Sequence, residues 1–372
     1  MDNTTESCSS HVGSIGEQIE AFRSIYWGIP LLSFLTVFAG LNLCMFIHSW
    51  VMIRRHVPYS ARRIFLVRFF ALFPIYSLTS IAGLYIPRAA LITNWVSSLY
   101  MSTTLYAFVL LIVDYFGGIE KMEAYMTGRE VSLRAPPFTC CCPCLPSVKF
   151  SMKLFHTFRG LVLQTAYIRP TIVFIGAVLW ADGIYNPSSI APDSAFIYLT
   201  AIGLLSSLLA VFGLSIIYNA TAEPLQYFMV GAKFNAMKFT LILTNAQNLV
   251  MGIFVKTGVI PCVGPFNTAS RGQVLYNMLV ICEMFLLTVM LKFYYCWWMS
   301  KNEYGRDSLS KTVGTHPLSD PEKNNGAAGE NQSQDVEKFR VTDAEKASEN
   351  GAYVNEIAID YEKNMKDEDT PL

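Results

Sequence analysis

Long runs of apolar residues alternate with short polar segments along most of this chain. Seven of the runs reach about 20 residues, the length that a helix needs to cross the hydrocarbon core of a bilayer. The seven runs cover residues 27–53, 64–86, 89–113, 161–185, 195–220, 239–260 and 272–298. Turn-forming segments separate several of them, such as Pro87-Arg88 and Asn186-Pro187. The pattern predicts an all-α, polytopic membrane protein with seven transmembrane helices.

The composition adds a polar tail to this picture. The 372 residues are 52% hydrophobic and 15% charged, against about 25% charged in average soluble domains. Residues 301–372 hold 9 Lys and Arg against 16 Asp and Glu, a net charge of −7. They contain few large apolar side chains, which is typical of disorder. We expect an N-terminal tail (1–25), a seven-helix domain (26–300) with a Cys-rich loop at 114–160, and a disordered acidic tail (301–372).

The basic residues of the loops predict the orientation of the chain, because they favour the cytosolic side. Twelve lie on one side: Arg54, Arg55, Arg62, Arg63, Lys121, Arg129, Arg134, Lys149, Lys153, Arg159, Lys233 and Lys238. Four lie on the other: Arg23, Arg88, Lys256 and Arg271. We therefore expect the N-terminus outside the cell and the C-terminal tail in the cytosol. The sequon Asn3-Thr4-Thr5 then faces the glycosylation machinery, so Asn3 is a candidate glycan site.

Four thiols crowd into five residues of the loop between the third and fourth spans. They are Cys140, Cys141, Cys142 and Cys144. Cysteines beside a membrane are the usual targets of S-palmitoylation, and several acyl chains anchor a loop better than one. Adjacent cysteines fit poorly around one tetrahedral zinc ion, and a cytosolic loop disfavours disulfides. Acylation is the favoured interpretation, with a metal site and unmodified thiols as the alternatives.

Polar residues inside the apolar runs are candidates for a solute path, because ionisable groups at bilayer depth usually face a bundle interior. Counting about 1.5 Å per residue places Glu283 near the midplane of the seventh span. The sixth span carries Thr244, Asn245, Gln247 and Asn248 at similar depth. These groups could line a path, or they could hold neighbouring helices together by hydrogen bonds.

Two residues that can carry a charge lie within the predicted spans. Arg169, which precedes Pro170 in the fourth span, is a candidate ligand for an anionic solute or a lipid headgroup. A bare carboxylate at Glu283 would repel an anion, so we expect this side chain to be protonated or paired with a cation such as Lys238 or Arg169.

Signatures of soluble enzymes are absent from the sequence. It contains no phosphate-binding Gly-rich loop, no Gly-x-Ser-x-Gly and no His-Glu-x-x-His. We expect no enzymatic activity, cofactor or metal, and the charge balance gives no reason to expect a nucleic-acid partner.

An ordered set of short motifs resembles the organic solute transporter alpha-subunit family. The motifs are Pro74-Ile75-Tyr76, Tyr106 with Asp114-Tyr115-Phe116-Gly117-Gly118, Arg169-Pro170 with Asp182-Gly183-Ile184-Tyr185, Tyr218, Lys233-Phe234 with Lys238 and Gln247, and Ile281-Cys282-Glu283-Met284-Phe285. Their order and spacing hold from about residue 25 to 298, and a cytosolic cysteine run is also found in that family. Asp114 and Asp182 stand where many relatives have glutamate, and Arg169 where many have lysine, so the charges are kept.

The resemblance implies facilitated, bidirectional movement of bile acids, conjugated steroids and related amphipathic anions across the plasma membrane. It also implies a dimer or a complex with a small single-span beta subunit. The polar positions that it carries over are Asp114, Arg169, Asp182, Lys238, Gln247 and Glu283.

Two other functions fit seven spans with the N-terminus outside. One is a G-protein-coupled receptor, although Asp114-Tyr115 lacks an adjoining arginine and the seventh span lacks Asn-Pro-x-x-Tyr. The other is a non-transporting membrane scaffold that works through the acylated loop and the acidic tail.

Overall fold

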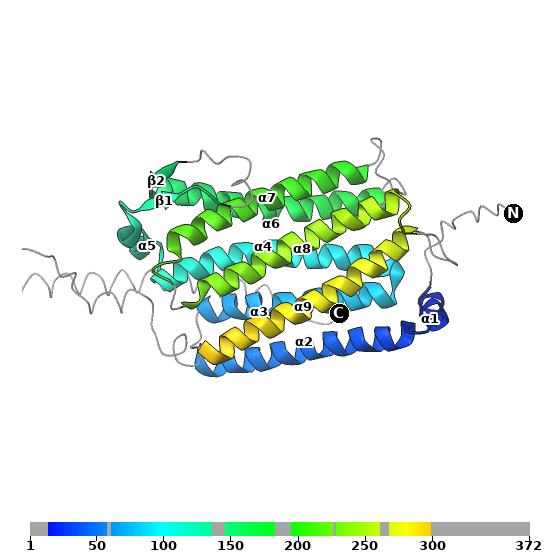
Figure 1. The fold of residues 1–372 in the computed structure, drawn as a ribbon. Helices are drawn as coiled ribbons and strands as arrows, with labels where there is room; N and C mark the ends of the chain where they lie inside the picture. The colour runs from blue at the N-terminus through cyan, green and yellow to red at the C-terminus, as the bar shows by residue number, and fades with distance from the viewer. Residues whose placement is uncertain are drawn as a thin grey trace, which may run out of the picture. The chain divides into compact units, whose positions relative to one another are not determined.

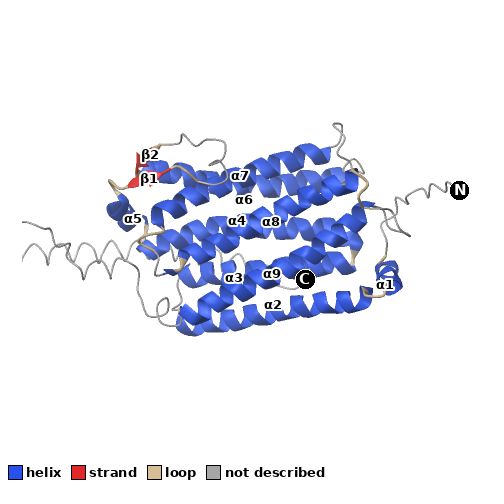
Figure 2. Ribbon diagram, in the orientation of Figure 1, coloured by secondary structure: helices blue, strands red, loops and turns tan. Residues whose placement is uncertain are grey.

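The computed structural model describes residues 14–57, 61–135, 146–182, 195–225, 228–260 and 268–298. Helices account for most of these residues (Figures 1 and 2). In chain order the elements are α1 (Ile15–Ser24), α2 (Gly28–His56), α3 (Ala61–Tyr85), the 3₁₀ turn η1 (Pro87–Ala89), α4 (Ala90–Phe116), α5 (Ile119–Met126), β1 (Glu130–Ser132), β2 (Ser147–Lys149), α6 (Met152–Ala181), α7 (Ala195–Thr221), α8 (Val230–Lys256) and α9 (Thr268–Trp298).

Seven of these helices are long and apolar enough to cross a membrane, which confirms the predicted all-α membrane protein. They are α2, α3, α4, α6, α7, α8 and α9. Helices α6 and α8 both begin nine residues before the predicted apolar runs. The added turns are amphipathic, so their polar residues lower an average hydropathy without interrupting the helix.

Three short elements were not predicted from the sequence. Helix α1 begins with a capping box, in which Ser14 N donates to Glu17 Oε2 across 2.6 Å and Glu17 N donates to Ser14 Oγ across 3.4 Å. Inside the expected Cys-rich loop lie α5 and a small antiparallel sheet, in which Val131 of β1 pairs with Val148 of β2 (Figure 2). A sheet of two three-residue strands leaves almost no periodic signal in a sequence.

Two glycines form the turn that ends α4. Gly117 and Gly118 have φ angles of 83° and 116°, a region that residues with a side chain rarely adopt. Their N–H groups donate to Asp114 O and Val113 O at 2.9 and 3.2 Å, so carbonyls of the last turn keep partners. The turn redirects the chain from α4 into α5.

The spans pack as a bundle in which α3 is central. Helix α3 contacts α2, α4 and α9, while α6 packs between α4 and α7, and α8 packs mainly on α9 (Figure 1). Buried apolar side chains of α3, α4 and α6 to α9 form the main core. A smaller core joins α1 to α2, α3 and α9 through Phe22, Leu35, Leu84 and Ile281.

A buried network of uncharged polar side chains joins three spans. Asn42 of α2, which is fully buried, donates from Nδ2 to Ser77 Oγ of α3 across 2.7 Å. Thr288 of α9 donates from Oγ1 to Asn42 Oδ1 across 2.8 Å. Hydrogen bonds of this kind hold helices together where apolar packing alone does not distinguish helix from lipid.

Burial is uneven along α6, α7 and α8. In α8 the described buried residues run from Val230 to Thr244, and in α7 they run from Gly203 to Thr221. Most buried positions of α6 lie in its first half, from Phe155 to Thr165. These three halves meet at the end of the bundle that carries β1 and β2, which we call the sheet end (Figure 1). Fewer residues are buried at the other end of these helices, which we call the loosely packed end.

Candidate functional site

Arg169 lies well inside the bundle, where its guanidinium reaches three other helices. It stands about 26 Å along α6 from the start of this 30-residue helix. Nη1 donates to Ser98 Oγ of α4 across 3.1 Å. Nη2 donates to Gly203 O of α7 across 3.2 Å, to Ser207 Oγ of α7, and to Asn245 Oδ1 of α8 across 3.4 Å. The guanidinium therefore joins α4, α6, α7 and α8.

All of the oxygens around Arg169 are neutral. They belong to two hydroxyls, one amide and one backbone carbonyl, and no described carboxylate lies within ion-pair distance of the guanidinium. Arginine keeps its charge in proteins. A positive charge held by neutral acceptors at this depth creates an attractive position for an anion.

Two tyrosines complete the surroundings of Arg169. Tyr76 of α3 interacts with Arg169 and with Thr244 of α8. Tyr276 of α9 interacts with Arg169, Tyr76 and Glu283. The site thus combines one cation with two aromatic rings, a mixture that suits a solute with an anionic group and an apolar body.

Gln247 and Glu283 form a second polar contact, on the seam between α8 and α9. Gln247 donates from Nε2 to Glu283 Oε1. Glu283 is the middle residue of the 31-residue α9. Neither Lys238 nor Arg169 forms the ion pair with Glu283 that the sequence left open, among the described contacts.

Asp114 lies at the sheet end, away from Arg169. Its Oδ2 accepts from Arg62 Nε of α3 across 2.7 Å. The Arg62 guanidinium also lies 5.2 Å from the ring centre of Tyr115, which stacks on Phe228 with ring centres 4.3 Å apart. Lys233 is fully buried beside them and donates to Tyr115 Oη across 2.8 Å and to Phe228 O across 2.9 Å. We call these five residues the sheet-end cluster.

The other predicted path residues lie apart from both contacts. The Lys238 ammonium stays over the rings of Phe234 and Phe239 on its own helix, at 4.9 and 5.8 Å. Asp182 is exposed just beyond the end of α6, and Asn248 is exposed on α8. The predicted polar stripe of α8 is therefore divided: Asn245 faces Arg169, Gln247 faces Glu283, and Asn248 faces outward.

Comparison with known protein families identifies the family of this chain. The family model described as Organic solute transporter Ostalpha matches residues 31–304, which include all seven spans. The chain belongs to the organic solute transporter alpha family. This is a family of transporters and not of enzymes, which agrees with the missing enzyme signatures.

Individual relatives of the organic solute transporter alpha family support the match. Organic solute transporter subunit alpha of Leucoraja erinaceus is 28% identical over 221 residues, which cover 59% of this chain and 63% of the relative, just under two thirds. The protein of that name in Bos taurus is 27% identical over 289 residues, covering 78% and 84%. The one in Homo sapiens is 28% identical over 273 residues, covering 72% and 78%. No solved structure matches the chain.

Several residues that contact Arg169 were not predicted from the sequence. Ser98, Ser207 and Tyr276 are uncharged, and such residues are common in transmembrane helices. The spacing of Gly203 and Ser207, four residues apart, marks one face of α7 as open to close approach. This spacing could have marked the face of α7 that another side chain approaches. It does not show that the side chain is that of Arg169.

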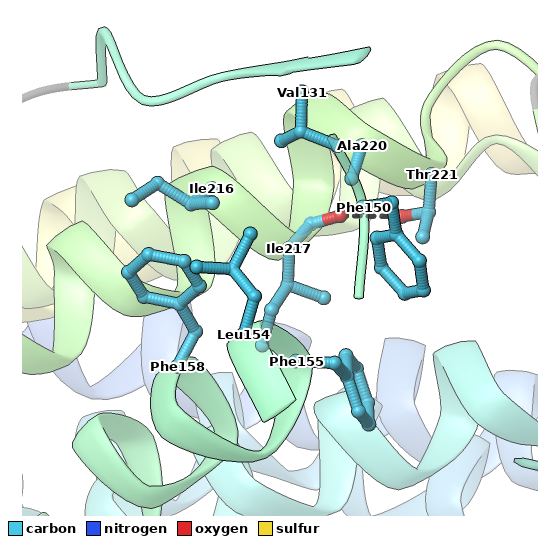
Figure 3. A pocket seen from close by; sticks show the side chains of 9 residues that line it. All are labelled: Val131, Phe150, Leu154, Phe155, Phe158, Ile216, Ile217, Ala220 and Thr221. Carbon is cyan, nitrogen blue, oxygen red and sulfur yellow. Dashed lines mark hydrogen bonds between the residues drawn. The ribbon is translucent and has the colours of Figure 1, made fainter. Parts of the chain in front are cut away.

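A small apolar cavity lies at the sheet end, and none of the predicted path residues lines it. Val131, Phe150, Leu154, Phe155, Phe158, Ile216, Ile217, Ala220 and Thr221 line it (Figure 3). The Thr221 hydroxyl donates to Ile217 O across 2.8 Å, so the one polar side chain is satisfied within its helix. Because it offers no group to an anion, we interpret it as a packing gap between β1, α6 and α7.

The remaining predicted sites fall elsewhere. Asn3 and the four cysteines, Cys140, Cys141, Cys142 and Cys144, lie outside the described residues. In the described ranges, no group of three or more His, Cys, Asp or Glu side chains could hold a metal ion.

Proposed function

We propose that this chain is a facilitative transporter of amphipathic organic anions, with Arg169 as the ligand for the anionic group. The observation that carries the proposal is a guanidinium deep within the bundle whose hydrogen-bond acceptors are all neutral. An entering carboxylate or sulfate would replace a neutral acceptor by an ionised one, which adds the attraction between opposite charges to the hydrogen bond. Transport needs no coupling ion in this proposal and runs in either direction with the solute gradient.

The surroundings of Arg169 favour solutes with a large apolar body. Tyr76 and Tyr276 interact with the cation, and most side chains that fill the core of the bundle are apolar. Bile acids and conjugated steroids have this combination of a flat apolar skeleton and one anionic group. Relatives named organic solute transporter subunit alpha support the same class of activity.

We propose a smaller set of path residues than the sequence suggested. These residues lie in the middle of their helices and form two contacts, Arg169 with Asn245 and Gln247 with Glu283. A solute would reach them from the loosely packed end, while the sheet-end cluster, which contains Asp114, closes the opposite end. By the basic-residue bias, the sheet end faces the cytosol.

The proposed setting is the plasma membrane, in contact with lipids and with a partner. The relatives above are named as alpha subunits, which supports a complex, either a homodimer or an assembly with a small single-span beta subunit. Acyl chains on the cysteine cluster would attach the cytosolic loop to the same membrane.

Flux of a labelled steroid sulfate into cells tests the proposal. Arg169→Gln removes the charge and should lower flux about tenfold or more, because hydrogen bonds to charged groups contribute about 1.5–3 kcal/mol. Arg169→Lys keeps the charge but loses the forked donors, so it should retain an intermediate flux. Surface biotinylation of each variant corrects the flux for the amount of protein at the membrane.

Arg54→Gln is the matched control for the loss of a cation. Arg54 is exposed at the end of α2, over the ring of Trp50 on the same helix. Its replacement should leave flux unchanged. Full flux through Arg169→Gln at normal surface levels would remove Arg169 from the path, and no flux through the wild-type chain, with or without a co-expressed single-span subunit, would favour a scaffold.

A further inference from the structure

The contact between Gln247 and Glu283 leaves two oxygens facing no donor. Gln247 Nε2 donates to Glu283 Oε1, which uses one oxygen of the carboxyl group. The second carboxyl oxygen, Glu283 Oε2, and the amide oxygen, Gln247 Oε1, are both buried and have no hydrogen-bond partner in the described part of the chain. Buried polar atoms without partners are rare, and each normally has a chemical reason.

A single proton on Glu283 would give both oxygens a hydrogen-bond partner. An ionised carboxylate and an amide oxygen can only accept, but a protonated carboxyl group has one O–H donor. A carboxylic acid and a primary amide join in a ring of two antiparallel hydrogen bonds, N–H to carbonyl and O–H to amide oxygen. Gln247 and Glu283 already make the first of these bonds, and the two unsatisfied oxygens are the atoms that the second would join.

We propose that Gln247 and Glu283 form a proton-binding site, in which Glu283 is held as a neutral carboxylic acid that donates from Oε2 to Gln247 Oε1. The role of this site in anion movement rests on the function proposed above. The occupant is a proton and not a metal ion. Two free oxygens fall far short of the six or so that a hard cation collects, and the described residues contain no acidic or histidine cluster.

The groups around Glu283 leave it without a counter-ion. On its own helix it interacts with Tyr276 and Cys282, and neither is cationic. Helix α8 brings Gln247, while Lys238 on that helix is held over its own aromatic neighbours. Arg169 of α6 is engaged by its neutral acceptors, and α2 and α3 form no ion pair with Glu283 among the described residues.

The proton decides the sign of the charge that a solute meets. With the proton bound, Glu283 is neutral and Arg169 is the net charge of the site, which favours anions. When the Oε2–H bond breaks and water takes the proton, a carboxylate remains on the α8–α9 seam and the ring loses one of its two hydrogen bonds. Loss of the proton as the pH rises should therefore reduce anion flux.

Infrared difference spectroscopy of the full chain in lipid nanodiscs tests the proton directly. A neutral acid absorbs as a carbonyl band that is distinct from the carboxylate bands. We expect such a band in the wild-type chain at neutral pH, its loss in Glu283→Gln, and a shift in Gln247→Leu, which removes the partner. Glu120→Gln, a change at an exposed carboxyl group on α5, should leave the band in place. Absence of the band from wild type, or its survival in Glu283→Gln, would overturn the proposal.

Flux in proteoliposomes over a series of pH values gives the functional readout. Glu283→Gln can form the same ring with two N–H donors but has no proton to release, so its flux of steroid sulfate should lose the decline at alkaline pH. A tenfold loss of flux in correctly inserted Glu283→Gln would show that the ionised carboxylate is required and refute the neutral acid. The infrared band does not depend on transport, so a wild-type chain that shows the band but carries no anion contradicts the proposed function alone.

Discussion

Arg62 at the start of α3 donates a hydrogen bond from Nε to Oδ2 of Asp114, the third residue from the end of α4, across 2.7 Å. The two side chains are only 13% and 27% exposed. Because the same guanidinium lies over Tyr115 and Phe228, this ion pair connects α3 and α4 to the segment that leads into α8. Asp114 therefore has a structural partner that accounts for its charge without a solute.

Asp114→Asn should destabilise the bundle. The change removes the carboxylate from its ion pair with the partly buried Arg62, and we expect a loss of about 1–2 kcal/mol, less than for a fully buried pair because the aspartate is partly exposed. Thermal unfolding of the purified protein in lipid measures the loss. Glu223→Gln is the matched control, because the Arg129–Glu223 pair is 3.8 Å long with side chains 42% and 88% exposed. Equal midpoints for the two variants would contradict the assignment.

Asn42→Ala should destabilise the bundle by a similar amount through a different mechanism. It removes both the donor to Ser77 and the acceptor for Thr288 inside the membrane, where one such hydrogen bond contributes roughly 0.6–1.7 kcal/mol. Asn248→Ala removes an exposed amide from α8 and should leave the unfolding midpoint unchanged. Equal unfolding midpoints for Asn42→Ala and Asn248→Ala would show that the Asn42 hydrogen bonds do not stabilise the bundle.

The four clustered cysteines should carry thioester-linked acyl chains. Each buried methylene contributes about 0.8 kcal/mol, so two or more chains attach a loop firmly. Hydroxylamine-dependent labelling should fall sharply when Cys140, Cys141, Cys142 and Cys144 are all replaced by serine. Cys44→Ser, at an exposed free cysteine of α2, serves as the control. Labelling that survives the fourfold change and disappears with Cys44→Ser would place the acyl chain on α2.

The N-terminus should lie outside the cell and the tail inside. Epitope tags at the two ends, probed before and after permeabilisation, test the orientation, and a tail accessible in intact cells would reverse it. Asn3→Gln should increase electrophoretic mobility by removing a glycan. Asn219, in the sequon Asn219-Ala220-Thr221 at the sheet end of α7, should not be modified, so Asn219→Gln should leave mobility unchanged.

The spans could be predicted from the sequence because the bilayer sets their length and polarity. A run of about 20 apolar residues has few structural alternatives, and the depth of Glu283 follows by counting residues along a regular helix. Helices α6 and α8 begin nine residues earlier than the predicted apolar runs. Hydropathy reflects the lipid contact of a segment, whereas a helix extends as far as its backbone hydrogen bonds continue. Lys233, fully buried in the added part of α8, shows how a charged residue can lower the apolar signal within a continuous helix.

The partners of the charged residues could not be predicted in the same way. Arg169 meets Asn245, 76 residues further along the chain, and Asp114 meets Arg62, 52 residues earlier. Such contacts depend on which helices are neighbours and on how each is rotated, and neither quantity is encoded in a local pattern. Arg169 was therefore recognised as a candidate from its depth and from the family resemblance, while its neutral acceptors emerged only from the fold.

Because α6, α7 and α8 bury more residues at the sheet end than at the opposite end, the two ends of the bundle should open at different rates. Separating the sheet end would expose the stacked rings of Tyr115 and Phe228 and the buried amine of Lys233 together, so its opening should be rare and cooperative. The opposite ends of the same helices share fewer buried contacts, and their backbone amides should exchange with deuterium much sooner. A solute held at Arg169 would then depart many times toward the loosely packed side for each passage through the sheet end, and the lifetime of the closed sheet end would govern net turnover.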